Sequence, residues 1–195
     1  MNRYKLTIEY DGKNFNGWQK QKNMKTVQGI IEESLFKFSG KKITIYGAGR
    51  TDTGVHASGQ VAHFDIEESG LEDKNSKLGK LTMGVNFYLS RLSDNRVSIL
   101  ETKKVTDEFH SRFSAKGRKY KYSILNRRTS SPLLKDKTWR IPIPLDVQLM
   151  KNAAKHLIGK HDFTAFRSVD CQANSPVKTI DNITIKNDGE LIEIY

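Results

Sequence analysis

The side chains best suited to chemistry lie in a glycine-rich segment that carries one acid and one base. Residues 47–60 read Gly-Ala-Gly-Arg-Thr-Asp-Thr-Gly-Val-His-Ala-Ser-Gly-Gln, with Arg50 and Asp52 two residues apart. An ionised carboxylate can act as a nucleophile or a general base, and a nearby guanidinium favours that ionised form. Glycines also let a substrate approach the backbone closely. The segment therefore offers Asp52 as a candidate catalytic carboxylate, with Arg50 beside it.

A nucleotide site and a tight turn are the alternatives for the same segment. A phosphate-binding P-loop ends in Gly-Lys-Ser or Gly-Lys-Thr, and this segment does not. A dinucleotide fingerprint needs a third glycine at the position of Asp52, where a carboxylate would repel pyrophosphate. A tight turn, with glycines at positive φ and Thr51 or Asp52 capping backbone amides, fits the same residues. The residues alone disfavour both nucleotide sites and leave the turn and the catalytic site open.

The remaining reactive side chains do not group into a metal or thiol site. The single cysteine, Cys171, excludes a disulfide framework and a zinc site built on several thiolates. No second carboxylate follows Asp52 closely enough to suggest a glycosidase pair or a two-metal centre. The histidines also lack the spacing of metal ligands; those considered are His56, His63, His110 and His161. No metal is therefore expected.

Simpler structural roles suit several of these side chains. We expect His56 to pack or hydrogen-bond behind the loop, and His161–Asp162 to cap a loop after Gly159. Aromatic residues at such spacings are more often core residues than platforms for bases. This expectation covers Trp18, Phe113, Phe163 and Phe166.

The hydrophobic pattern predicts rigid elements on both sides of the loop. Alternating apolar residues predict strands over 4–10, 43–45, 62–66 and 97–105. Thr26 is a suitable N-cap and Gly40 a suitable left-handed C-cap for a helix between them. The apolar residues of that helix are Val27, Ile30, Ile31, Leu35 and Phe38, and those of a second helix are Leu78, Leu81, Val85, Leu89 and Leu92.

The second half of the sequence predicts further strands and one more helix. Tyr120, Tyr122 and Ile124 share one face of a predicted strand, and two more strands are expected over 180–185 and 191–194. Asp146 is placed to cap a helix that Gly159 ends, with Val147, Met150, Ala154, Leu157 and Ile158 on its apolar face. Strands outnumber helices and do not alternate regularly with them, which favours an α+β class with a boundary near 106–111.

A large excess of positive charge favours a polyanionic partner. The net charge is +11, and residues 112–140 hold ten Lys or Arg and one acid. Residues 13–25 hold four lysines and no acid. Lysines also serve simply to solvate a surface, but the interleaving with aromatics at 118–122 favours nucleic acid. No apolar run approaches the roughly 20 residues needed to cross a bilayer, and the N-terminus lacks a signal-peptide core, so a cytoplasmic location is expected.

Four motifs, in order, resemble those of the tRNA pseudouridine synthase A family, and the resemblance spans essentially the whole chain. The most specific is Gly47-Ala-Gly-Arg-Thr-Asp-Thr-Gly-Val-His-Ala57. The others are Tyr10-Asp-Gly12 with Phe15 and Gly17-Trp-Gln19, then Phe109-His-Ser-Arg-Phe-Ser-Ala115 with Arg118 and Tyr120-Lys-Tyr122, and finally Gly159-Lys-His-Asp-Phe163 with Phe166.

The resemblance implies an isomerase that converts uridine to pseudouridine in the anticodon stem-loop of tRNA, at positions 38 to 40 of the tRNA, with no cofactor and no metal. Asp52 matches the essential carboxylate. Three roles stay open for it: attack on the sugar, attack on the base, or abstraction of a sugar proton. Tyr120 matches the tyrosine that lies against the target base. Arg50 matches the arginine beside the acid, which helps to turn the nucleotide out of its stack.

The same resemblance implies an architecture and a set of partners. The expected fold is the pseudouridine synthase fold, with two α+β halves whose mixed and antiparallel sheets meet at a central basic cleft. Residues 1–108 are expected to form the half that carries Asp52, and residues 109–195 an incomplete second half. The tRNA anticodon arm is the implied partner, bound by a homodimer in which the tRNA spans both subunits.

Two departures from the family pattern stand out. Thr53 stands where the family has alanine, a change that we expect to be tolerated. After a segment like 191–195, the family continues through a Gly-Phe-Leu-x-x-Met-Val-Arg run, which supplies an arginine that pairs with the catalytic acid. That run is not among these 195 residues. A non-catalytic tRNA-binding or tRNA-remodelling module is therefore a second hypothesis.

The coding sequence after codon 195 distinguishes the two hypotheses. An in-frame Phe-Leu-x-x-Met-Val-Arg run would indicate an active enzyme of which these residues are a part. Absence of that run would favour the non-catalytic module.

Overall fold

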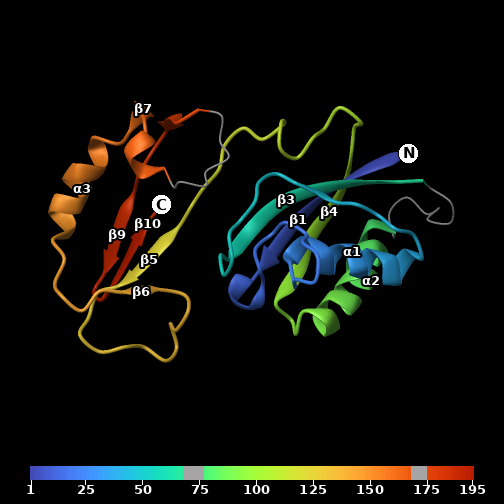
Figure 1. Cartoon of the computed structure of the whole chain (residues 1–195), viewed down its shortest axis with the longest axis horizontal. Helices are drawn as coiled ribbons and strands as arrows, with labels where there is room; N and C mark the ends of the chain where they lie inside the picture. The colour runs from blue at the N-terminus through green and yellow to red at the C-terminus, as the bar shows by residue number, and fades with distance from the viewer. Residues whose placement is uncertain (68–76, 168–174) are drawn as a thin grey trace. The chain divides into compact units, whose positions relative to one another are not determined.

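The computed structural model describes residues 1–67, 77–167 and 175–195. Its backbone contacts divide the chain into two compact units, Met1–Gly117 and Arg118–Tyr195 (Figure 1). Residues 109–117, which the sequence analysis assigned to the second half, are part of the first unit. Each unit combines helices with a β-sheet, which confirms the α+β class.

The first unit is built on a four-stranded sheet in the order β2-β3-β1-β4. The central strand β1 (Asn2–Tyr10) pairs antiparallel with β3 (Ala57–Ile66) on one side and with β4 (Val97–Val105) on the other. The short strand β2 (Tyr46–Gly47) extends the sheet beyond β3. Every second residue of β1 is buried, namely Tyr4, Leu6, Ile8 and Tyr10. The alternating pattern therefore predicted the three long strands correctly.

Two helices, α1 (Val27–Ser39) and α2 (Lys77–Leu92), cover one face of this sheet (Figure 1). Thr26 Oγ1 accepts a hydrogen bond from Gly29 N–H at 3.3 Å, and Gly40 follows α1 with φ 70°, so both predicted caps are confirmed. The predicted burial of Leu78 falls outside the described side chains. The remaining helix residues of the core include Val27, Ile31, Leu35, Leu81, Val85 and Leu89. No helix in the described parts is long and apolar enough to cross a membrane.

The predicted strand over 43–45 is wrong, although Ile43 and Ile45 are both buried. The backbone of Ile45 is bound by side chains of α1 and not by a neighbouring strand. Its N–H donates to Glu32 Oε1 at 3.2 Å, and its carbonyl accepts from Gln28 Nε2 at 3.1 Å. Strand pairing begins one residue later, at Tyr46.

On the opposite face of the sheet, segment 107–114 is attached to β1 and β3. Arg3 pairs with Asp65 across the sheet at 2.7 Å and also donates to the carbonyl of Phe109 at 2.9 Å. Ser111 Oγ donates to the carbonyl of Tyr46 at 2.7 Å and lies 2.9 Å from His63 Nδ1. These contacts give residues 109–111 of the third motif a structural role.

We predict that His63 makes the first unit less stable as the pH falls from about 7.5 to 5.5. His63 is 2% exposed, and burial lowers its pKa, an effect that His110 and Arg3 strengthen. Below the ordinary histidine pKa of about 6.5, the unfolded chain therefore binds a proton that the folded unit does not bind. The free energy of unfolding should fall with pH, by at most about 1.4 kcal/mol per pH unit from this group.

Urea denaturation, followed by the fluorescence of the buried Trp18, measures this pH dependence in the wild type and in His63→Gln. The variant should lose the histidine contribution to the slope. His156→Gln, at an exposed position, is the matched control and should keep it. The same slope in all three proteins would contradict the prediction.

The second unit contains a smaller sheet in the order β6-β5-β10-β9. The strand β5 (Tyr122–Leu125) pairs in parallel with β6 (Trp139–Arg140) and antiparallel with β10 (Leu191–Ile194), which also pairs with β9 (Ile185–Asp188). The helix α3 (Val147–Lys155) packs on it, and its core centres on Ile124, Ile185 and Ile192. Two further strands, β7 (Gly159–Asp162) and β8 (Val177–Ile180), pair separately. The structure also contains short 3₁₀ helices: η1 (Gly12–Asn14) lies in the first unit and η2 (Thr164–Phe166) in the second.

Three details of the second unit differ from the sequence prediction. The predicted strand over 180–185 is two strands, because Ile180 pairs with β7 whereas Ile185 pairs with β10. The helix α3 ends at Lys155, and Gly159, with φ 107°, opens β7. Tyr120 precedes β5 and is not part of the strand. The predicted N-cap is confirmed, since Asp146 Oδ1 accepts from Leu149 N–H at 2.9 Å.

Candidate active site

Asp52 is exposed, in the loop that joins β2 to β3. Val55 N–H donates to the carbonyl of Asp52 at 3.2 Å, which closes a turn over residues 52–55. Gly54 takes the positive φ of 79° that such a turn requires. The tight turn predicted from the glycines and an accessible carboxylate therefore occur in the same loop.

The segment after β1 holds this loop in place. Trp18 N–H donates to the carbonyl of Thr51 at 3.0 Å, and Gly54 N–H donates to the carbonyl of Phe15 at 3.3 Å. The Tyr10 hydroxyl lies 2.7 Å from Thr51 Oγ1, and burial raises the pKa of this phenol, so it stays protonated. Phe15 and Trp18 are each 2% exposed, so Trp18 is a core residue as expected.

Glycines allow the segment and the loop to approach one another closely. A Cβ on Gly12 would fall 2.0 Å from the carbonyl oxygen of Val55, and one on Gly17 would fall 2.6 Å from that of Thr51. On the loop side, a Cβ on Gly47 would fall 2.6 Å from Trp18 Nε1. A side chain at Gly12 or Gly17 would displace the backbone of the loop, and one at Gly47 would displace the ring of Trp18. Gly47 therefore makes room for protein packing, not for a substrate as the sequence suggested.

His56 lies at the other end of the loop and contacts the same segment. Gly12 N–H donates to His56 Nδ1 at 3.1 Å, and Asp11 Oδ1 lies 3.0 Å from the same nitrogen. Asp11 in turn pairs with Arg96 at 2.8 Å. The expectation that His56 hydrogen-bonds behind the loop is confirmed.

Arg50 is exposed on the approach to Asp52 and is oriented by a glutamine that the sequence analysis did not single out. Its Nε donates to Gln19 Oε1 at 3.1 Å. The neighbouring backbone is held from β3, because Gln60 Nε2 donates to the carbonyl of Gly49 at 2.6 Å. The presence of Gln19 in the Gly-Trp-Gln motif was the one sequence signal for this role.

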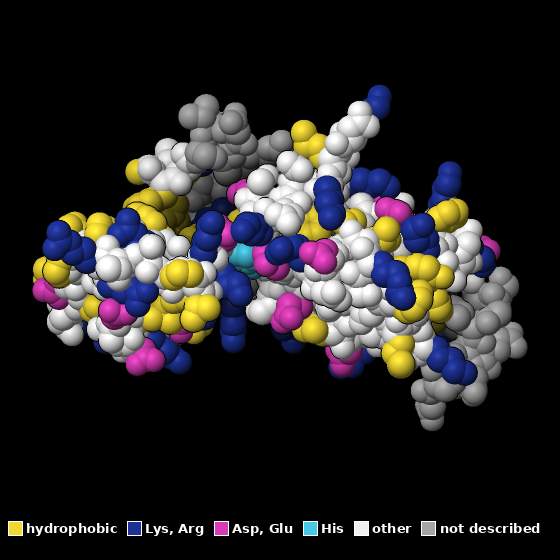
Figure 2. All heavy atoms as spheres, turned by 90° about the horizontal axis from the view of Figure 1, so that it is seen from below, with side chains coloured by type: hydrophobic (Ala, Val, Ile, Leu, Met, Phe, Trp, Pro, Cys, Tyr) yellow, Lys and Arg dark blue, Asp and Glu magenta, His cyan; other side chains and the backbone are white. Residues whose placement is uncertain are grey.

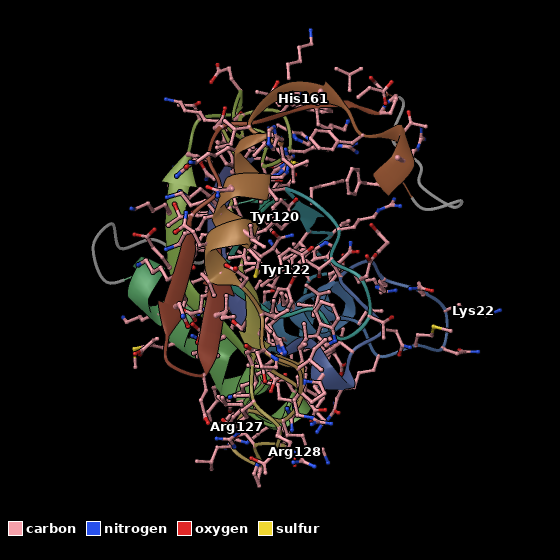
Figure 3. The ribbon with its side chains drawn as sticks, turned by 90° about the vertical axis from the view of Figure 1, so that its left-hand side faces the viewer. Lys22, Tyr120, Tyr122, Arg127, Arg128 and His161 are labelled. Atoms are coloured by element: carbon pink, nitrogen blue, oxygen red, sulfur yellow. The ribbon has the colours of Figure 1, made fainter. Side chains whose placement is uncertain are left out.

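Tyr120 belongs to the second unit, whereas Asp52 and Arg50 belong to the first. Its side chain is 66% exposed, and that of Tyr122 is 69% exposed. Asp52 and Arg50 are thus two exposed residues of one loop, and the ring of Tyr120 is accessible within its own unit. In the second unit, Arg127 and Arg128 follow β5 at one end and His161 lies at the other (Figure 3). In the first unit, Lys22 extends outward from the loop before α1 (Figure 3).

The other candidates have structural roles or stay accessible. Asp162 Oδ1 accepts from Thr164 N–H at 2.8 Å, and the two hydrogen bonds from Thr164 lower the pKa of this carboxyl group. These contacts cap the loop that leads into η2, as expected for Asp162. Phe113 and Phe166, expected in the core, are instead 78% and 75% exposed. Cys171 lies outside the described residues, and within them no three His, Cys, Asp or Glu side chains could hold a metal ion.

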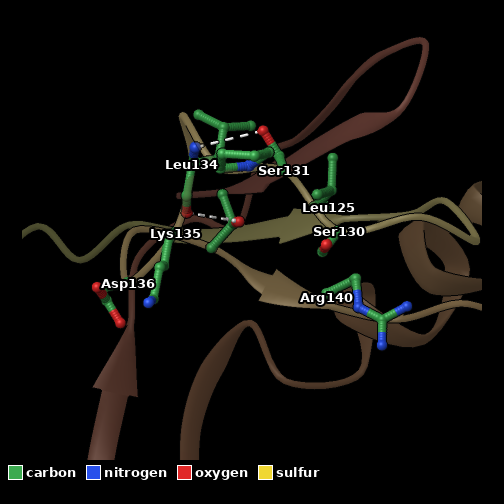
Figure 4. A pocket seen from close by; sticks show the side chains of 9 residues that line it. Leu125, Ser130, Ser131, Leu134, Lys135, Asp136 and Arg140 are labelled. Atoms are coloured by element: carbon green, nitrogen blue, oxygen red, sulfur yellow. Dashed lines mark hydrogen bonds between the residues drawn. The ribbon is translucent and has the colours of Figure 1, made fainter.

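In the described parts of the chain, a pocket beside β5 is not lined by the residues proposed from the sequence, and the charges visible on one face do not single them out. One pocket of the second unit lies beside β5 and β6, where Ser131, Leu134 and Arg140 are among its lining residues, and Tyr120 is not one of them (Figure 4). Lys and Arg side chains are spread over the visible face of both units, among hydrophobic ones, in Figure 2. The candidate site is therefore described by the loop that carries Asp52.

We predict that Gly17→Ala loosens the Asp52 loop. Alanine at φ 76° is strained, and its Cβ would also collide with the Thr51 carbonyl. The free energy of unfolding should fall by about 2–3 kcal/mol in urea denaturation followed by Trp18 fluorescence. Gly40→Ala is the matched control: its φ is 70° but no atom lies within 4 Å, so the strain of φ alone, about 1 kcal/mol, should remain. Equal losses in the two variants would contradict the steric contact.

Comparison with known proteins agrees with the motifs. Residues 6–86 and 153–195 match the family model described as tRNA pseudouridine synthase. The tRNA pseudouridine synthase A of Bartonella henselae is 47% identical over 195 residues, which cover 100% of this chain and 76% of that protein. Those of Wolbachia pipientis wMel and Sinorhizobium fredii are each 48% identical, over 98% and 100% of this chain and 75% and 76% of their own lengths. The chain therefore belongs to the tRNA pseudouridine synthase family, and its α+β architecture is consistent with the pseudouridine synthase fold.

Proposed function

We propose that this chain converts uridine to pseudouridine in tRNA, with Asp52 as its essential carboxylate. The observation that carries the proposal is an exposed Asp52 on a tightly held loop, in a chain similar over its whole length to proteins named tRNA pseudouridine synthase A. Those names favour a catalytic protein over the non-catalytic tRNA-binding module. The matching carboxylate is what this reaction needs from the protein.

The reaction is an isomerisation within one nucleotide. The N-glycosidic bond breaks, the base rotates, and C5 bonds to the same sugar carbon. The proton lost from C5 balances the one gained by the released ring nitrogen, so the stoichiometry requires no redox cofactor. Asp52 contributes as a nucleophile toward the sugar or the base, or as the base that abstracts a sugar proton.

We assign Arg50 and Tyr120 to substrate binding. Extrusion of a nucleotide from its stack costs a few kcal/mol, which new contacts have to offset. An exposed tyrosine ring such as that of Tyr120 can supply about 1–3 kcal/mol by stacking on a base. The guanidinium of Arg50, in the same loop as Asp52, suits a phosphate or the vacated position in the stack.

The partner proposed for this activity is the anticodon arm of tRNA, with uridines at positions 38 to 40 as targets. The lysines of 13–25 and the Lys and Arg of 112–140 complement its phosphates. A homodimer that binds one tRNA across both subunits, located in the cytoplasm with its substrate, completes the proposal.

We predict that Asp52→Asn abolishes turnover and leaves tRNA binding intact. The amide can neither attack nor accept a proton, so release of tritium from C5-labelled tRNA should fall by at least about 100-fold. The dissociation constant for tRNA should not rise, because the change removes no cation that contacts phosphate.

The control is Asp94→Asn, on the turn before β4. Asp94 is exposed and has φ 53°, a conformation that asparagine adopts readily. This variant should turn over normally. Normal turnover by Asp52→Asn on an unmodified transcript would refute the role of Asp52.

A further inference from the structure

Arg50 is connected to the interior of the first unit by a chain of side-chain hydrogen bonds. Arg50 Nε donates to Gln19 Oε1 at 3.1 Å, and Gln19 Nε2 donates to Gln28 Oε1 at 2.9 Å. Gln28 Nε2 then donates to Glu32 Oε1 at 3.1 Å. Gln28 and Glu32 lie one turn apart on the face of α1 that packs against the core. They are only 7% and 8% exposed. An exposed cation is thus linked to two buried polar residues.

The buried amide of Gln28 has one possible orientation. Its Oε1 also accepts from Lys20 N–H at 2.8 Å, and its Nε2 also donates to the carbonyl of Ile45 at 3.1 Å. A flipped amide would place its NH₂ against the Lys20 N–H and its oxygen against the Ile45 carbonyl and the Glu32 carboxylate. Each of these pairs consists of two donors or two acceptors. Three neighbours therefore determine which end of Gln28 points toward Gln19.

The orientation of Gln28 determines that of Gln19. Because Gln28 presents its oxygen, Gln19 has to present its NH₂ to it, which leaves the Gln19 oxygen for Arg50. A guanidinium has donors and no acceptor, so it bonds to this oxygen and would be repelled by the NH₂ group. The carboxylate of Glu32 also accepts from Lys20 Nζ at 2.7 Å, which holds the far end of the chain.

We propose that Gln28 and Gln19 are positioning residues that orient Arg50 for the reacting nucleotide. Together with Glu32 they form a chain of hydrogen bonds, called the relay below, in which the donor and the acceptor of every bond are fixed. The inference rests on the proposed role of Arg50 in substrate binding. Holding this long, exposed side chain in one orientation removes rotamer entropy that would otherwise be lost when the nucleotide leaves its stack, a step that follows tRNA binding. The relay should therefore act on kcat more than on KM.

The direct test is Gln19→Met. Methionine keeps the length of the side chain and removes the acceptor of the hydrogen bond from Arg50 Nε. The kcat for tRNA should fall about tenfold, the effect of one hydrogen bond to a charged group, with a smaller change in KM. Gln21→Met is the matched control, since Gln21 is exposed and bonds to the carbonyl of Asn16 outside the relay; its kcat should equal that of the wild type. A wild-type kcat in Gln19→Met would overturn the relay.

A second measurement separates positioning from a general loss of structure. Gln28→Met should lower kcat as much as Gln19→Met, and the double variant should lower it no further, because both break one chain. In an Arg50→Met background, Gln19→Met should change kcat by less than about twofold, since the residue it orients is gone. Additive losses of Gln19→Met and Gln28→Met would show that the two glutamines do not act as one chain. An undiminished loss from Gln19→Met in the Arg50→Met background would show that Gln19 acts independently of Arg50, and either result would overturn the relay.

Failure of the relay is distinguishable from failure of the proposed function. If the wild type releases no C5 hydrogen from tRNA, the proposed function fails, whatever the glutamines do. If the wild type is active and Arg50→Met is also fully active, the role of Arg50 is refuted and the relay with it. If Arg50→Met is impaired and Gln19→Met is not, the relay alone is refuted.

Discussion

Close backbone packing between the Asp52 loop and the segment after β1 is the constraint on which the site depends. Gly12 and Gly17 lie against the carbonyls of Val55 and Thr51, at distances that no Cβ allows. Trp18 fills the space beside Gly47 and anchors the segment in the core. Because these contacts leave no room for adjustment, the carboxylate is held on a rigid surface while its own side chain stays open to solvent.

Much of the fold followed from the sequence where one local signal was enough. Alternation predicted β1, β3 and β4, and the caps at Thr26, Gly40 and Asp146 predicted where helices begin or end. The prediction failed over 43–45, because buried side chains of α1 took the hydrogen bonds that a strand partner would have taken. It failed over 180–185, where one apolar run serves two separate sheets. In both segments the alternation of apolar residues is the same as in an ordinary strand, so it could not reveal these arrangements.

The candidate site, too, was predictable from the sequence only in part. Asp52 and Arg50 were identifiable from residue type and spacing, since a carboxylate and a guanidinium among glycines are unusual. The hydrogen bond from Arg50 to Gln19 was not identifiable, because Gln19 is 31 residues away and no sequence pattern marks an amide oxygen as the acceptor for a distant arginine. The expectation that Phe113 and Phe166 are buried failed for a related reason: composition predicts the average environment of an aromatic residue, not the individual one.

The amides that orient Arg50 also bear on how its orientation responds to pH. Gln19 and Gln28 do not ionise, so the direction of their hydrogen bonds is the same in acid and in base. A guanidinium keeps its charge across the physiological range as well. The orientation that these two amides impose on Arg50 therefore does not itself depend on pH.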